Sequence, residues 1–246
     1  MKLIASDYDG TFTNRGGVDD ARRQAVARWQ KAGNKFGIVS GRSIDFLPST
    51  LARDGVQCDF FIANNGAVIT DGTGAILAET HCDGSIAPTL IRAMFELGCP
   101  HASVTTAFPC TVYPALREPK AGRYTLEDLP TVAYFHQIST VLPTFEEAAR
   151  VTAEIAKQFG EWVNPLQNGI CIDIVPTGID KAEGIRSLLA LWRIAESDVI
   201  AVGDNVNDAA MIAAFPAYAV ENAVESIKAL AGRTVADLTE LIEKEL

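Results

Sequence analysis

The chain has 246 residues, of which 48% are hydrophobic and 21% are charged, the balance of an ordinary globular protein. Disorder, collagen and coiled coil are therefore excluded as its overall class. Its 31 acidic residues outnumber its 21 basic ones, and the net charge of −10 makes nucleic acid an unsuitable partner, because a polyanion is bound by a basic surface. No apolar run approaches the ~20 residues that span a bilayer, and the first residues reach Asp7 and Asp9 too soon for a secretory signal. We expect a cytoplasmic protein with no membrane partner.

The first part of the chain alternates short apolar runs with segments of helical periodicity. Strands are predicted over residues 2–6, 36–40 and 59–63, and helices over 19–33 and 43–54. Strands that alternate with helices indicate a parallel, doubly wound α/β sheet. In such a sheet the carboxyl ends of the strands form the ligand site.

This alternation breaks after the third strand. A β-hairpin is predicted over residues 67–79, and the segment 82–175 mixes helical and strand-like stretches, which is typical of an α+β domain. From Lys181 the alternation of helices and strands resumes, and the chain ends in helices. We therefore predict a core domain formed by residues 1–81 and 176–246, with residues 82–175 inserted as a second, α+β domain.

Two aspartates follow the first predicted strand, in the segment Asp7-Tyr8-Asp9-Gly10-Thr11. Two carboxylates at positions i and i+2 of a turn can flank one reacting atom, and they offer the oxygen ligands that Mg²⁺ prefers. They also suit a reaction in which one carboxylate attacks and the other moves protons. The alternative is a pair of solvated turn residues.

Three further polar segments lie where a predicted strand ends or a helix begins. Ser40-Gly41-Arg42-Ser43 opens a helix, where a hydroxyl and free N–H groups can bind phosphate. Lys181 also begins a helix, where its positive charge lies at the positive end of the helix dipole, which is unfavourable. Its position there therefore indicates a nearby anion. The segment Gly203 to Asp208 follows a strand and offers two acids and two amides. Singly, these segments can be explained as a helix cap, a solvated lysine and a polar loop, but together they can converge on one crevice.

In this order, the four segments resemble motifs one to four of the haloacid dehalogenase (HAD) superfamily. Asn64-Asn65-Gly66-Ala67 and Asn222-Ala223 are similar to the Cof-type subfamily, whose α+β cap (type IIB) is inserted between motifs two and three. The resemblance covers most of the core and implies a Rossmann-like HAD core; it covers the cap at 82–175 only by position and type. One departure is Asn205, where the fourth motif usually has a glycine. Because asparagine adopts a positive φ less readily than glycine, the family pattern does not predict the backbone there.

The resemblance also implies roles for the matching residues. Asp7 would be the nucleophile that forms an aspartyl-phosphate, and Asp9 would be the general acid and then the general base. The ligands of Mg²⁺ would be Asp7, Asp9 through its backbone carbonyl, Asp204 and, in support, Asp208. The residues that would bind the substrate are Ser40, Gly41, Asn64, Asn65, Lys181 and Asn207.

The expected activity is Mg²⁺-dependent hydrolysis of a small phosphorylated metabolite, most simply a sugar phosphate. A phosphomutase or phosphotransferase would use the same aspartyl-phosphate, and the sequence does not separate these activities. A non-catalytic phosphate sensor or a receiver domain is less favoured, because Asp7 and Asp9 are both present and a receiver carries no such insertion. In the cap, residues suited to selecting the substrate, none of them assigned, are Arg117, Lys120, Arg123, Tyr124, His136 and Trp162. The oligomeric state is not indicated.

Overall fold

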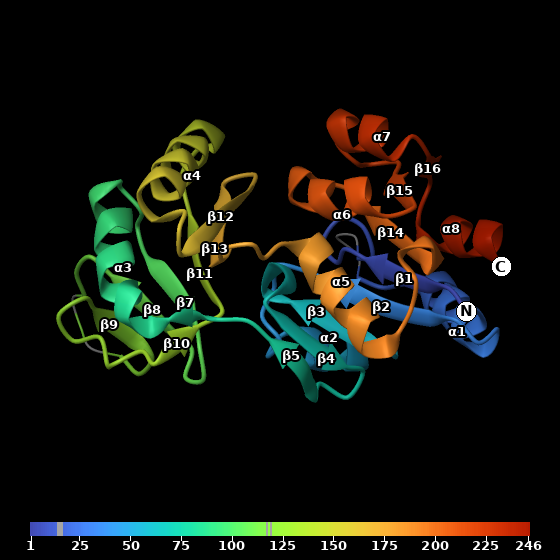
Figure 1. Ribbon diagram of the computed structural model, residues 1–246, viewed down its shortest axis with the longest axis horizontal. Helices are drawn as coiled ribbons and strands as arrows, with labels where there is room; N and C mark the ends of the chain where they lie inside the picture. The colour runs from blue at the N-terminus through green and yellow to red at the C-terminus, as the bar shows by residue number, and fades with distance from the viewer. Residues whose placement is uncertain (14–16, 117, 119) are drawn as a thin grey trace. The chain divides into compact units, whose positions relative to one another are not determined.

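The computed structural model describes residues 1–13, 17–116, 118 and 120–246. The chain divides into two compact units, one formed by residues 1–78 and 180–246 and the other by residues 79–179 (Figure 1). These boundaries differ from the predicted ones by a few residues at each crossing. Within the described ranges, no helix has the length and apolar character that crossing a membrane requires.

The first unit is built on an eight-stranded sheet with the order β16-β15-β14-β1-β2-β3-β4-β5. Its strands are β1 (Leu3–Ser6), β2 (Lys35–Val39), β3 (Phe60–Ala63), β4 (Val68–Asp71), β5 (Ile76–Glu79), β14 (Val199–Gly203), β15 (Ala217–Val220) and β16 (Thr234–Val235). All neighbours from β16 to β3 are parallel, whereas β4 runs antiparallel to β3. The prediction of a doubly wound α/β core is confirmed.

Helices cover both faces of the parallel strands, since every residue of β1, β3, β14 and β15 is buried. Strands buried on both faces read as continuous apolar runs, which is why they could be recognised in the sequence. The helices of this unit are α1 (Asp20–Lys31), α2 (Leu47–Arg53), α5 (Lys181–Trp192), α6 (Ala209–Ala214), α7 (Glu225–Ala231) and α8 (Leu238–Glu245). Helix α1 packs on α8, and α6 packs on both α5 and α7.

Helix α1 shows how the sequence sets the limits of an element. The side chain of Asp19 accepts a hydrogen bond of 2.8 Å from the backbone N–H of Arg22, which satisfies one of the free N–H groups at the helix start. Ala25, Val26 and Trp29 form one buried stripe. The helix therefore begins at a polar cap and is held by its apolar face.

The strand order reverses between β1 and β14, which are parallel neighbours. The chain passes from β1 to β2 on one side and later returns to β14 on the other, so a crevice opens at the carboxyl ends of β1 and β14. Asp7 follows β1, and its backbone N–H donates a hydrogen bond of 2.9 Å to the carbonyl of Val202 in β14. Asp204 follows β14 directly. The topology thus brings the acids of the first and fourth motifs together.

The second unit has its own six-stranded sheet, with the order β12-β13-β11-β7-β8-β9. Its elements are β6 (Cys82–Asp83), α3 (Ala87–Glu96), β7 (Ala102–Thr105), β8 (Cys110–Tyr113), β9 (Arg123–Thr125), β10 (Tyr134–Phe135), β11 (Gln137–Val141), α4 (Phe145–Phe159), β12 (Val163–Asn168) and β13 (Cys171–Pro176). Only β8 and β9 pair in parallel among the described neighbours of this sheet. Residues of the two helices and of one sheet face, such as Leu90, Val151 and Ile138, form an apolar core separate from that of the first unit.

Three short strands were not predicted from the sequence, β6, β9 and β16. Strand β16 lies in a segment expected to be helical, whereas β6 and β9 lie in segments for which no element was predicted. Each has only two or three residues and sits at the edge of its sheet. A strand this short does not show the alternation that identifies longer ones.

The burial of β1 predicts a large difference between two isoleucines of the same sheet. Ile4 on β1 is fully buried, whereas Ile76 on β5 is 56% exposed. We expect Ile4→Ala to lower the free energy of unfolding by about 2–5 kcal/mol, because it leaves a cavity between the sheet and its helices. Ile76→Ala should lower it by less than about 1 kcal/mol. Urea unfolding followed by circular dichroism measures both; equal shifts would contradict the assigned burial.

Candidate active site

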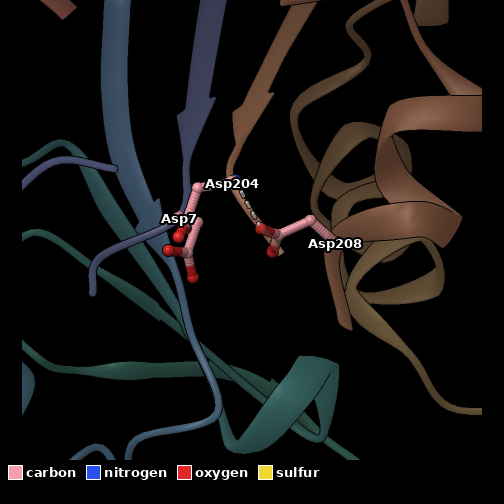
Figure 2. Close-up of side chains that lie close together, drawn as sticks. All are labelled: Asp7, Asp204 and Asp208. Atoms are coloured by element: carbon pink, nitrogen blue, oxygen red, sulfur yellow. Dashed lines mark hydrogen bonds between the residues drawn. The ribbon is translucent and has the colours of Figure 1, made fainter. Parts of the chain in front are cut away.

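Three carboxylates gather at the carboxyl ends of β1 and β14, those of Asp7, Asp204 and Asp208. One oxygen of each lies within 4.8 Å of the others. Figure 2 shows Asp7 and Asp204 next to each other, with Asp208 reaching toward them from the following loop. Asp7 and Asp208 are buried and Asp204 is half-buried. Buried carboxylates held this close are a donor set that fits a hard divalent cation such as Mg²⁺.

Lys181 provides the positive charge of this cluster. Its fully buried side chain places Nζ 2.6 Å from Asp7 Oδ1 and 2.5 Å from Asp208 Oδ1. Lys181 is the first residue of α5, and the side chain of Asp180 caps that helix by accepting a hydrogen bond from the N–H of Glu183. The capped helix start therefore delivers the ammonium group to the carboxyl ends of the strands.

Burial and like charge dominate the electrostatics of the cluster. Burial, and next the charge of Asp208, raise the pKa of Asp7 well above its usual range, although Lys181 acts in the opposite direction. Burial is also the main cause of the raised pKa of Asp204. For Lys181, burial lowers the pKa, but the carboxylates of Asp208 and Asp7 together outweigh it and raise the pKa. One ammonium does not balance three carboxylates, and a divalent cation would supply the missing charge.

Asp208 is engaged at both of its oxygens. Oδ1 accepts from Lys181, and Oδ2 accepts from the backbone N–H groups of Asp204 at 2.9 Å and Asn205 at 3.1 Å. These bonds hold the loop after β14 in place and orient the lysine. Because both of its oxygens already accept hydrogen bonds, Asp208 fits a role in supporting the metal ligands better than direct coordination of the metal.

Asn205 is accommodated without strain. Its φ is −132° and its ψ is 169°, an extended conformation that any residue can adopt. Its side chain accepts a hydrogen bond of 2.8 Å from the N–H of Val206 and caps the short helix η4 (Val206–Asp208). The glycine usual at this position of the family is therefore not needed here for its backbone freedom.

The loops after β2 and β3 are joined to each other. Ser40 is buried; its Oγ accepts a hydrogen bond of 3.1 Å from the N–H of Arg42, and its carbonyl accepts one of 2.9 Å from the N–H of Asn65. The N–H of Asn64 in turn donates to the carbonyl of Arg42 at 3.0 Å. Ser40, Asn64 and Asn65 thus belong to one hydrogen-bonded network that joins the two loops.

Asn64 combines two unfavourable features. Its φ is +51°, followed by +53° at Asn65, in a region that residues other than glycine rarely adopt. Its side chain is fully buried, and neither amide atom has a hydrogen-bond partner among the described residues. Strain and an unsatisfied buried amide at one position indicate a functional role, which agrees with the predicted place of Asn64 in the substrate site.

Two glycines allow close approaches that a side chain would block. At Gly10, with φ +87°, a Cβ atom would lie 2.4 Å from Oδ2 of Asp204. At Gly66, with φ +108°, it would lie 2.2 Å from the carbonyl oxygen of Asp180. These glycines let the loop after β1 reach Asp204 and let the loop after β3 reach the start of α5.

Asp9 lies outside the carboxylate cluster. Its side chain is 53% exposed and accepts two hydrogen bonds from Arg42, one of 2.6 Å from Nε and one of 2.7 Å from Nη2. Sequence reasoning gave Arg42 no role, because the pair joins residues 33 positions apart that no local pattern connects. Coordination of a metal by the backbone carbonyl of Asp9 stays a prediction.

Two other predicted residues lie in loops that carry the site. Gly41 follows Ser40, and Asn207 precedes Asp208 in η4; both are half-buried. Their contact with phosphate stays a prediction. Sequence reasoning also assigned no role to Thr11, whose Oγ1 donates a hydrogen bond of 2.7 Å to Oδ1 of Asp204.

Comparison with known proteins identifies the family. Residues 4–240 match the model of the haloacid dehalogenase-like hydrolases. The chain belongs to this family. The HAD protein is 27% identical to the 5-amino-6-(5-phospho-D-ribitylamino)uracil phosphatase YbjI of Escherichia coli strain K12, with 94% of this chain and 89% of that one covered. It is 26% identical to a phosphoglycolate phosphatase of Halorubrum lacusprofundi, with 95% and 90% covered.

Solved structures show the same HAD fold. A haloacid dehalogenase-like hydrolase from B. subtilis superimposes with a TM-score of 0.86 at 20% identity, over 100% of both chains. A HAD subclass IIB sugar phosphatase superimposes with a TM-score of 0.83 at 18% identity, over 100% of this chain and 99% of that one. The predicted family and the prediction of a hydrolytic enzyme are confirmed. The relatives from E. coli and H. lacusprofundi and the subclass IIB structure are named phosphatases.

The raised pKa of Asp7 predicts an effect on stability. A carboxyl whose pKa rises on folding binds its proton more tightly in the folded chain, so metal-free stability falls as the pH rises from the unfolded-state pKa toward the folded one. Asp7→Asn removes this charge. In EDTA at about pH 8, the variant should therefore unfold at a higher temperature than the unchanged protein, and added Mg²⁺ should raise its midpoint less.

The matched control for this measurement is Asp9→Asn, because that carboxylate is exposed and outside the cluster. It should give no gain in EDTA. Thermal unfolding followed by circular dichroism compares the two variants. A lower midpoint for Asp7→Asn than for the unchanged protein in EDTA would contradict the electrostatic interpretation.

Proposed function

We propose that this HAD protein is a cytoplasmic, Mg²⁺-dependent phosphatase that hydrolyses a small phosphorylated metabolite, a sugar phosphate, through an aspartyl-phosphate. The observation that carries the proposal is the buried pair of Asp7 and Lys181, 2.6 Å apart, beside Asp204. A nucleophile, an ammonium that can neutralise phosphate oxygens and a metal-binding carboxylate are the groups that phosphoryl transfer requires. The named phosphatases among the relatives support it.

The metal would be held by Asp7, Asp204 and the backbone carbonyl of Asp9, with Asp208 in support. The hydroxyl of Thr11 donates to Oδ1 of Asp204 and so orients that carboxylate. When bound, Mg²⁺ supplies positive charge that neutralises the phosphoryl group. Burial is the main cause of the raised pKa values of Asp7 and Asp204, and a bound cation would offset its effect on both carboxylates, which supports this assignment.

The reaction would proceed in two displacements. In the first, a carboxylate oxygen of Asp7 bonds to phosphorus, the bond from phosphorus to the alcohol oxygen breaks, and Asp9 donates a proton to the departing alcohol. In the second, water bonds to phosphorus while Asp9 takes its proton, and the bond to Asp7 breaks. Lys181, Ser40, Gly41 and Asn207 would hold the phosphate oxygens in both displacements.

The second unit, residues 79–179, would act as the cap that selects the substrate. Of the residues considered for this role, Arg117 lies outside the described residues. His136 is only 8% exposed, and its Nε2 lies 3.0 Å from Oε2 of Glu79, so a structural role suits it better than contact with a substrate. Trp162, at 50% exposed, remains available for contact. The relatives named for a phosphorylated ribityl compound and for phosphoglycolate support a small ester of an alcohol.

Phosphate release tests the proposal. With Mg²⁺, the protein should release phosphate from 4-nitrophenyl phosphate and from at least one member of a panel of sugar phosphates, and EDTA should stop the release. Asp7→Asn should reduce turnover to background, because the nucleophile is lost, while circular dichroism stays unchanged. The control Asp198→Asn changes an exposed aspartate of the short helix η3 (Glu196–Asp198), away from the carboxylate cluster, and should keep full activity.

Other outcomes are equally informative. Full activity of Asp7→Asn would sink the assigned mechanism. Movement of phosphate between positions of a sugar without release would identify a phosphomutase. Tight binding of phosphate esters with neither release nor movement would identify a sensor.

A further inference from the structure

Arg42 forms a two-point ion pair with Asp9. Nε and Nη2 of its guanidinium lie 2.6 Å and 2.7 Å from the two carboxylate oxygens. A planar guanidinium bound in this way fixes both the direction and the plane of a carboxylate. The Asp9 side chain is half-exposed, so packing alone does not set its orientation.

The guanidinium is itself held by two aromatic rings. Its central carbon lies 4.3 Å from the ring centre of Phe46 and 5.7 Å from that of Tyr8. The two rings meet edge to face, with centres 6.2 Å apart, and Tyr8 is buried. Cation–π contacts of this kind favour one position of the guanidinium. Tyr8 directly precedes Asp9 in the chain, and Phe46 directly precedes α2. The two rings that contact the guanidinium are therefore fixed to the backbone on both sides of the ion pair between Arg42 and Asp9.

The backbone of Arg42 is also anchored within the site. Its N–H donates to Oγ of Ser40 at 3.1 Å, and its carbonyl accepts from the N–H of Asn64 at 3.0 Å. The arginine thus connects the second motif to the residue proposed as acid and base. Any shift of the loop after β2 would be passed to the Asp9 carboxylate.

From this geometry we infer that Arg42 is the positioning residue for Asp9: it aims the carboxylate that exchanges protons with the leaving alcohol and the water. The inference rests on the proposed function. A carboxylate offers about four lone-pair sites, and Arg42 uses two, so capacity remains for the reacting oxygen. Asp9 and Arg42 both line a cleft of about 920 Å³, together with Gly10 and Asn222, which leaves room for a leaving group.

The test compares two leaving groups. An alkyl alcohol such as glycerol departs from phosphate only with a proton, whereas 4-nitrophenol departs without one. The specificity constant kcat/KM reports the displacement in which the alcohol leaves. Arg42→Lys keeps the positive charge but cannot make the two parallel hydrogen bonds of the guanidinium. It should lower kcat/KM for glycerol phosphate, or for the best alkyl substrate of the panel, by about tenfold or more and change that for 4-nitrophenyl phosphate far less.

A double-mutant cycle ties the effect to Asp9. In an Asp9→Asn background, Arg42→Lys should cause no further loss with the alkyl substrate, because the residue it positions no longer transfers protons. Phe46→Leu removes one of the two rings that contact the guanidinium. It should lower kcat/KM by a smaller factor than Arg42→Lys does, again more for the alkyl substrate than for 4-nitrophenyl phosphate. The matched control is Arg28→Lys: Arg28 pairs with Glu243 at 3.6 Å and does not line this cleft, and both rates should be unchanged.

Three results would overturn the inference. One is an equal loss with both substrates, which would assign Arg42 to phosphate binding. Another is a further drop in kcat/KM when Arg42→Lys is added to Asp9→Asn, equal to the drop that it causes in the unchanged protein. The third is a thermal midpoint of Arg42→Lys so low that loss of folded protein explains the whole drop in activity. The proposed function is judged separately. If Asp9→Asn alone lowers both rates equally, the acid assignment fails, and if the unchanged protein releases no phosphate from any substrate, both proposals fail.

Discussion

The site depends on one buried ammonium group among carboxylates. Asp7 and Asp208 lose their hydration on folding, and Lys181 compensates by lying within hydrogen-bonding distance of both. Removing the ammonium of Lys181 would leave two buried carboxylates without a cation in a medium of low polarity, which is strongly unfavourable. Lys181 and Asp7 are 174 positions apart, so their pairing requires that the two halves of the first unit assemble. The same contact therefore links completion of the fold to completion of the site.

Much of the first unit and of its candidate site could be predicted, because the parallel sheet brings residues that are far apart in the sequence next to each other. Once β1 and β14 are recognised as parallel strands, Asp7 and Asp204 must end at the same edge of the sheet. What could not be predicted are contacts set by side-chain direction. The pair of Asp9 and Arg42 has no periodicity that reveals it, and the hydroxyl of Thr11 reaches Asp204 only because Gly10 permits the approach.

Resemblance to the family and physical chemistry gave different information. The family pattern pointed to the residues that the structure gathers at the carboxyl ends of β1 and β14. It did not predict the backbone at Asn205, which is extended and whose side chain caps η4. Conversely, Asn64 matches the family pattern, yet the structure shows a left-handed backbone and an unsatisfied buried amide there. The cost of such features is of the order of 1–3 kcal/mol, and the well-packed strands of the first unit offset it.

The presence of two separate apolar cores has a consequence for how such a protein diversifies. A change among Leu90, Ile138 and Val151 alters the packing of the second unit but leaves the buried charges of the first unit in the same surroundings. If the second unit selects the substrate, as proposed, mutations there can be selected for new specificity while the charged groups of the first unit stay unchanged. On that proposal, the architecture lets evolution vary which ester is recognised without rebuilding the groups that would cleave it.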